Sequence, residues 1–264
     1  MKCKKLFIIT IVFLLAFIFY SNNFKSEIPP AKINSIQYAD PTQTIILWDL
    51  HGVVFAQKLS TAMGIVWGYN RKFEILQHLN IPLVKLMGNF LLQLLRLTSQ
   101  EVTSEELIAT ARNAHNNPLI ELALQISSAY HPIKGVVEII KELNSLGYQQ
   151  DIGSNIGETS FYVFKKKYPT IFYYFNHEHI VRYRPGKKII KKPNKEYFLN
   201  YLYDYNLNAD QVIFIDDKIA NVQAARAVGM HAIHFKNPGK FRTDLQNLGI
   251  SLALSKTSSI EQYD

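Results

Sequence analysis

The stretch from Thr44 to Phe55, which reads TIILWDLHGVVF, constrains the fold more than any other part of the chain. It opens with the four apolar residues 45–48, a pattern typical of a strand buried on both faces of a parallel sheet. Asp49 follows where this strand should end, and Gly52 lets the chain turn sharply. Ligands of open α/β sheets bind beyond the carboxyl ends of the strands, so Asp49 is a candidate nucleophile, metal ligand or both.

Composition indicates a globular protein with anionic partners. Hydrophobic residues make up 48% and charged residues 19% of the 264 residues, which excludes a disordered chain and leaves room for a leader and one α/β domain with an insertion. The net charge of +8 favours phosphorylated substrates, anionic lipid or nucleic acid. Nucleic acid is not expected, because no motif for it occurs and the basic residues are spread widely. The single cysteine, Cys3, excludes internal disulfides.

The amino-terminal residues 1–24 have the layout of a signal peptide or membrane anchor. Three lysines precede the apolar run from Leu6 to Tyr20. A helix of this length spans ~22 Å, short of the ~30 Å hydrocarbon core, which favours a cleaved signal. No pair of small residues at the spacing of a signal-peptidase cleavage site follows Tyr20, which favours an uncleaved anchor. A buried core helix is a third interpretation. We expect a single-pass anchor with the domain outside the cytoplasm, or alternatively a secreted protein. Residues 25–43 contain three prolines and are interpreted as a linker.

The sheet pattern is expected to stop after Phe55 and to resume at about residue 148. Between these points, apolar residues recur at helical spacing from Phe73 to Leu97, and a capping pattern begins at Thr103. A further helix is predicted over 120–130. Residues 55–131 are therefore interpreted as an all-helical insertion, either a separate unit or helices that pack on the core.

Two later segments place polar side chains at predicted strand ends or loops. The strand over 148–155 ends in Ser154 and Asn155, whose hydroxyl and turn amides can hold an anionic oxygen; a plain helix cap is the alternative. The run RYRPGKKIIKK over 182–192 is typical of a solvated loop, and its last residue, Lys192, precedes Pro193 and a predicted helix.

A pair of acids follows the last strong buried strand, residues 212–215. Asp216 and Asp217 lie between this strand and a helix predicted over 219–228. Two adjacent carboxylates at a strand end repel each other unless a cation is present, and carboxylate oxygens suit Mg²⁺. The alternative is that the acids favour the helix amino terminus.

Taken in order, Asp49, Ser154, Lys192 and the pair Asp216-Asp217 resemble the four motifs of the haloacid dehalogenase (HAD)-like hydrolase superfamily, in its subfamily I type with a helical cap. The segment IDDKIANVQAARAVGMHAIHF is the most specific match. The resemblance implies an α/β fold, a doubly wound parallel sheet with a Rossmann-type core. This core would comprise residues 44–54 and 132–264, with residues 55–131 as the inserted all-helical cap.

The resemblance also implies a magnesium-dependent phosphatase that hydrolyses a small phosphate monoester through an aspartyl-phosphate on Asp49. In the family's register Asp217 is the direct Mg²⁺ ligand and Asp216 the outer one. The metal site also includes Asp49 and the backbone carbonyl of His51. Asn221 supports the site one helical turn later.

The remaining residues are assigned to the phosphoryl group and to proton transfer. Ser154, Asn155 and Lys192 would bind the phosphoryl oxygens. His51 stands where the family has a second acid, and an imidazole can still protonate the leaving group and activate water. A catalytically weak pseudo-phosphatase that binds a phosphorylated ligand is the alternative that His51 supports. A dehalogenase needs no magnesium, so the intact acid pair disfavours it.

Overall fold

The computed structural model describes residues 38–57, 130–182, 184 and 186–253. The predicted leader, most of the predicted linker and the interior of the predicted helical cap lie outside these residues and stay predictions. Within the described ranges, no helix combines the length and the apolar character that crossing a bilayer requires.

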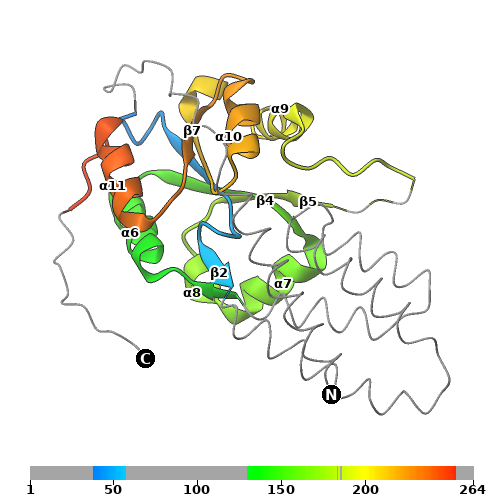
Figure 1. Cartoon of the computed structure of the whole chain (residues 1–264), viewed down its shortest axis with the longest axis horizontal. Coiled ribbons are helices and arrows are strands. Elements are labelled where there is room, and N and C mark those ends of the chain that lie inside the picture. The colour runs from blue at the N-terminus through cyan, green and yellow to red at the C-terminus, as the bar shows by residue number, and fades with distance from the viewer. Residues whose placement is uncertain (1–37, 58–129, 183, 185, 254–264) are drawn as a thin grey trace, which may run out of the picture. The chain divides into compact units, whose positions relative to one another are not determined.

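A five-stranded parallel sheet forms the centre of the described structure, in the order β5-β4-β1-β6-β7 (Figure 1). The strands are β1 (Ile45–Trp48), β4 (Gln149–Gly157), β5 (His177–Val181), β6 (Val212–Asp216) and β7 (His231–His234). The central strand β1 pairs with β4 on one side and with β6 on the other. The chain therefore changes direction across the sheet at β1, and ligands bind at such a switch point. The predicted doubly wound parallel sheet is confirmed.

Helices follow the strands. They are α6 (Lys134–Ser145), α7 (Glu158–Lys167), α8 (Pro169–Phe172), α9 (Lys195–Asp204), α10 (Ile219–Arg226) and α11 (Pro238–Asn247), with a short 3-10 turn, η2 (Ala209–Gln211). α9 begins after Asn194, whose side chain accepts a hydrogen bond from the Glu196 backbone N–H. The buried residues of α6 recur at helical spacing, so one stripe of this helix faces the core.

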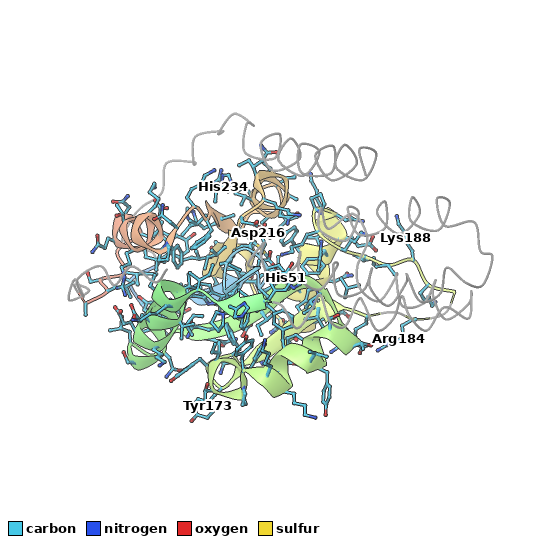
Figure 2. All side chains as sticks on the ribbon, turned by 60° about the horizontal axis from the view of Figure 1, so that its bottom comes forward. His51, Tyr173, Arg184, Lys188, Asp216 and His234 are labelled. Carbon is cyan, nitrogen blue, oxygen red and sulfur yellow. The ribbon has the colours of Figure 1, made fainter. Side chains whose placement is uncertain are left out.

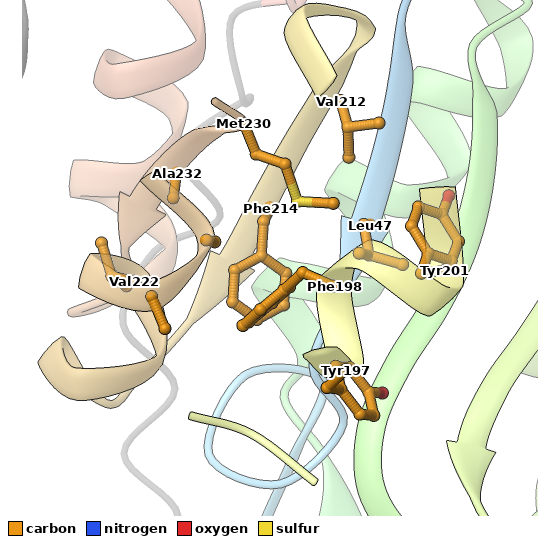
Figure 3. Packing of buried hydrophobic residues seen from close by; sticks show 11 residues of the cluster. Leu47, Tyr197, Phe198, Tyr201, Val212, Phe214, Val222, Met230 and Ala232 are labelled. Carbon is orange, nitrogen blue, oxygen red and sulfur yellow. The ribbon is translucent and has the colours of Figure 1, made fainter. Parts of the chain in front are cut away.

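The core lies on both faces of the sheet, because successive side chains of a strand point to opposite faces. On one face, Leu47 and Phe214 pack with residues of α9 and α10, among them Phe198 (Figure 3). On the other, the rings of Trp48 and Phe241 of α11 meet edge to face at 5.4 Å between centroids. All five side chains of β6 and all four of β1 are buried, as the apolar runs predicted.

The prediction that no strand occurs between Phe55 and residue 148 is wrong at both ends of the insertion. β2 (Phe55–Gln57) and β3 (Tyr130–Pro132) pair as an antiparallel two-stranded ribbon. Three residues are too few for a periodic pattern, and Pro132 is a residue that disfavours strands except at the edges of sheets. The ribbon pairs Gln57 with Tyr130, and it follows β1 after a turn over residues 49–54.

Candidate active site

The carboxyl ends of the central strands bring the predicted site residues together. Asp49 directly follows β1, Ser154 lies in β4, Asp216 ends β6, and Lys192 precedes α9. All four are buried. Figure 2 shows His51 and Asp216 over the middle of the sheet, whereas Lys188 of the preceding basic loop lies at the periphery.

The two carboxylate oxygens of Asp49 differ in their partners. Oδ1 accepts hydrogen bonds from the Leu50 backbone N–H at 2.8 Å and from Ser154 Oγ at 2.8 Å, and it lies 3.1 Å from Lys192 Nζ. Oδ2 is buried without a hydrogen-bond partner among the described residues. Such an oxygen is costly to bury unless a ligand binds it.

The two acids of the pair differ in the same way. Asp216 has both oxygens occupied, by Lys192 Nζ at 2.7 Å, by the Lys218 backbone N–H and by the Asn221 side chain. Asp217, by contrast, has a buried Oδ1 with no hydrogen-bond partner in the described part of the chain. The free oxygens of Asp49 and Asp217 are therefore the ones available to a ligand.

Burial and mutual repulsion shift the pKa values of these groups. Burial, then Asp216 and Asp49, raise the pKa of Asp217 to about 8. Burial also raises the pKa of Asp216, to about 6, although Lys192 opposes this shift. For Lys192, burial lowers the pKa but the two acids that contact it outweigh burial, so the net pKa is raised. One buried ammonium in contact with this cluster does not balance three carboxylates.

The three acids fit a divalent cation. Asp49, Asp216 and Asp217 each offer an oxygen, and these oxygens lie within 4.8 Å of one another. Oxygen ligands with surplus negative charge suit Mg²⁺. Gly52 makes this geometry possible: its φ is +83°, and a Cβ there would lie 2.3 Å from Asp217 Oδ2. A side chain at this position would displace the acid.

The raised pKa of Asp217 predicts a cation effect on stability that depends on pH. Between the ordinary pKa of 3.8 and the folded value of about 8, the folded protein keeps a proton that the unfolded chain has lost. The free energy of unfolding of the metal-free protein therefore falls as pH rises through this range. A cation competes with that proton, so we expect ~10 mM Mg²⁺ to raise Tm more at about pH 8.5 than at about pH 5.5.

The measurement is thermal unfolding of the full chain, with and without Mg²⁺, at both pH values. Asp217→Asn is the matched control, because it keeps the shape of the side chain and removes its charge. This variant should lose most of the Mg²⁺ effect at both pH values. A wild-type Tm shift that is equal at the two pH values would contradict the assignment of Asp217 as a ligand.

Two predicted residues position their neighbours. The Asn155 side chain accepts a hydrogen bond from the Lys192 backbone N–H at 2.8 Å and donates one to the Lys192 carbonyl at 2.9 Å. Both ends of this amide are thus used to place Lys192, and substrate binding through the Asn155 backbone stays a prediction. Asn221 holds Asp216, in line with its predicted supporting position.

His51 is partly buried between two aromatic rings. Its ring centroid lies 4.5 Å from that of Tyr130 and 5.4 Å from that of Phe164. Burial lowers the pKa of His51 to about 4, with Asp49 opposing the shift and Lys192 adding to it. The imidazole is therefore neutral at pH 7 in the ligand-free site. The predicted role of its backbone carbonyl toward the metal stays a prediction.

Two further residues of the site were not identified from the sequence. Tyr130 lies close enough to Asp217 and Asp49 for their charges, after burial, to raise its pKa. Lys218 lies near the three carboxylates, yet burial outweighs them and lowers its pKa. Its place directly after Asp217 was a usable signal. Tyr130 gave none, because it lies far along the chain from every motif.

Known proteins share parts of this sequence. A family model described as haloacid dehalogenase-like hydrolase matches residues 59–235, a range that holds Ser154, Lys192 and the acid pair but begins after Asp49. Flavin mononucleotide hydrolase 1 of Arabidopsis thaliana is 33% identical over 66 residues, which are 25% of this chain and 27% of that protein. A sesquiterpene phosphatase of Aspergillus oryzae is 42% identical over 45 residues, 17% of this chain and 23% of that protein. The matches thus span about a quarter of each relative's length.

Among solved structures, a predicted HAD-like family hydrolase from Porphyromonas gingivalis is similar, with a TM-score of 0.49 and 21% identity over 78% of this chain and 97% of that one. The family model covers well over half of the chain and includes three of the four motifs. The chain therefore belongs to the haloacid dehalogenase-like hydrolases.

Proposed function

We propose that the protein is a magnesium-dependent phosphatase that hydrolyses a small phosphate monoester through an aspartyl-phosphate on Asp49. The observation that carries this proposal is the difference between the two carboxylate oxygens of Asp49 in their hydrogen-bond partners. Oδ1 contacts Ser154 and Lys192, whereas Oδ2, like Oδ1 of Asp217, is buried without a hydrogen-bond partner among the described residues. One oxygen of each of these two acids lies within 4.8 Å of the other. This arrangement suits a carboxylate that meets a phosphoryl group on one side and a cation on the other.

The side chains around Asp49 can support both steps of such a reaction. The carboxylate attacks phosphorus, the phosphorus–oxygen bond to the alcohol breaks, and water later displaces phosphate from Asp49. Ser154 and Lys192 lie 2.8 and 3.1 Å from the attacking carboxylate, within reach of the phosphoryl oxygens. A bound divalent cation would supply charge that offsets the three carboxylates and the phosphoryl group.

The names of the two curated relatives, a flavin mononucleotide hydrolase and a sesquiterpene phosphatase, support a phosphorylated substrate. The test is release of inorganic phosphate by the full-length protein from a panel of phosphate monoesters in the presence of Mg²⁺. The proposal expects turnover of at least one ester and none in excess EDTA. A panel without any phosphate release would contradict it.

A second candidate function is a pseudo-phosphatase that binds a phosphorylated ligand without efficient turnover. The observation that favours it is His51, which replaces the family's second acid and is neutral at pH 7 in the ligand-free site. Binding of a phosphonate analogue without phosphate release from any ester would select this candidate.

The role proposed for His51 is proton transfer to and from the alcohol and water. Because the imidazole is neutral in the ligand-free site, this role requires the negative charge of a bound phosphate ester to raise the pKa of His51 again. We expect His51→Ala to slow alkyl phosphates by about 10²–10⁴-fold and aryl phosphates far less, because only poor leaving groups need the proton. The measurement is kcat/KM for a series of esters that differ in the acidity of the alcohol. His177→Ala is the control, since His177 lies at the start of β5 and pairs with Asp151. An equal loss for both classes of ester would show that His51 is not the proton donor.

A further inference from the structure

Three aromatic rings form a continuous group beside the nucleophile, here named the aromatic wall: His51, Tyr130 and Phe164. Their ring centroids lie 4.5 Å apart for His51 and Tyr130, 5.4 Å for His51 and Phe164, and 5.6 Å for Tyr130 and Phe164. Phe164 is buried, whereas His51 and Tyr130 are only partly buried. His51 and Tyr130 therefore each keep part of their residue surface accessible.

The wall is linked to the reacting group through His51 and Tyr130. His51 lies two residues beyond Asp49, and the charges of Asp217 and Asp49 both act on Tyr130. The polar side chains that contact Asp49, namely Ser154 and Lys192, come from other strand ends and form no part of the wall. The described site thus has a polar side for the phosphoryl oxygens and an aromatic side.

Backbone contacts hold Tyr130, one of the two partly buried residues of the wall, in place. Tyr130 is the first residue of β3 and pairs with Gln57 of β2. Its carbonyl accepts a hydrogen bond from the Tyr168 hydroxyl at 2.8 Å. Phe164 lies in α7, so a strand and a helix fix the wall from both sides. A fixed aromatic surface discriminates between ligands better than a mobile one, because binding does not have to order it.

We propose that the aromatic wall contacts the alcohol part of the substrate and selects phosphate monoesters whose alcohol carries a planar aromatic ring close to the phosphate. The inference rests on the proposed function, which places the phosphoryl group at Asp49. In an in-line displacement the alcohol departs on the side of phosphorus opposite the carboxylate, and the proposal places the exposed parts of His51 and Tyr130 on that side. Rings of this kind prefer edge-to-face or offset contact with another ring.

The experiment compares two pairs of ligands that have the same carbon skeleton and differ in aromaticity. Benzyl phosphate and cyclohexylmethyl phosphate test turnover. The phosphonates 2-phenylethylphosphonate and 2-cyclohexylethylphosphonate, in which CH₂ replaces the bridging oxygen, test binding by calorimetry without any reaction. The full-length wild type should prefer the aromatic member of each pair by about fivefold or more. Apolar area alone would favour the larger cyclohexyl group.

Variants at Tyr130 assign the preference to the wall. Tyr130→Leu should weaken the aromatic ligands by about tenfold, mainly in KM and Kd, and leave the cyclohexyl ligands nearly unchanged. Tyr130→Phe keeps the ring and should keep the preference. Tyr162→Leu is the matched control: Tyr162 also belongs to this region, on α7, but is 67% exposed and outside the wall. It should change neither ligand pair.

The possible failures are distinguishable. A wild type without preference for the aromatic phosphonate overturns the inference, and so does an equal loss for both pairs in Tyr130→Leu. Because the wild-type preference is measured directly, poor folding of Tyr130→Leu leaves the inference testable, and Tyr130→Phe must then retain it. Preferred binding of the aromatic phosphonate without hydrolysis of any ester upholds the wall and contradicts the proposed phosphatase activity.

Discussion

Asp49→Asn is expected to reduce phosphate release by at least about 10⁴-fold while the protein stays folded, because an amide cannot serve as the nucleophile and one anionic ligand of the cation is lost. The measurement is kcat on the best ester of the panel, with circular dichroism and Tm as checks on folding. The buried position of Asp49 at the end of β1, with Ser154 and Lys192 on its Oδ1, gives the substitution this large effect.

The matched control for this variant is Asp204→Asn, the same change at an exposed acid at the end of α9. It should leave kcat unchanged. Retention of more than a few per cent of activity in Asp49→Asn would show that the reaction does not pass through an aspartyl-phosphate on this residue.

Removal of the cation is expected to stop the reaction, and the two neighbouring acids should differ in how they depend on it. EDTA should abolish phosphate release and Mg²⁺ should restore it. Asp217→Ala should raise the Mg²⁺ concentration needed for half-maximal activity more than Asp216→Ala, because Asp217, unlike Asp216, has a buried oxygen without a described hydrogen-bond partner.

Thermal stability should show the opposite order, with Asp216→Ala lowering Tm more than Asp217→Ala. Asp216→Ala removes the carboxylate that accepts from Lys192 and Asn221, so it leaves a buried ammonium with fewer partners and should lower Tm by several degrees. Asp217→Ala relieves repulsion between acids and should not lower the Tm of the metal-free protein. Titration of activity with Mg²⁺ and thermal unfolding of both variants test this pair of expectations. If Asp216→Ala affected the Mg²⁺ requirement as much as Asp217→Ala, the ligand assignment would be wrong.

The centre of the fold and the acidic residues could be predicted because their signals are local. In β1 and in β6, a short apolar run predicts the strand, and the acid that follows it, Asp49 or Asp216, marks where the strand ends. β2, β3 and β5 escaped prediction for physical reasons. β2 and β3 are three residues long and exist only because they pair with each other. β5 carries histidines and partly buried side chains at a sheet edge, so it lacks an apolar run.

The chemistry of His51 shows where sequence reasoning stops. The chain order places charged residues near it: Asp49, which raises its pKa, and Lys192, which lowers it. The structure adds burial against Tyr130 and Phe164, which is the dominant cause and lowers the pKa to about 4. Burial depends on residues that are distant in sequence, as Tyr130 is, and no pattern around residue 51 reports them.

The ribbon formed by β2 and β3 has a consequence for how such a protein can change over evolutionary time. β2 and β3 pair with each other, and the Ile133 backbone N–H donates to the Val54 carbonyl just inside this junction. Two antiparallel strands that follow one another in this way have the topology of a hairpin, and the residues between them are its loop. The entropy of closing a loop grows only with the logarithm of its length. Segments of different length and sequence can therefore be exchanged at this junction, and the nucleophile, Lys192 and the acid pair keep their places.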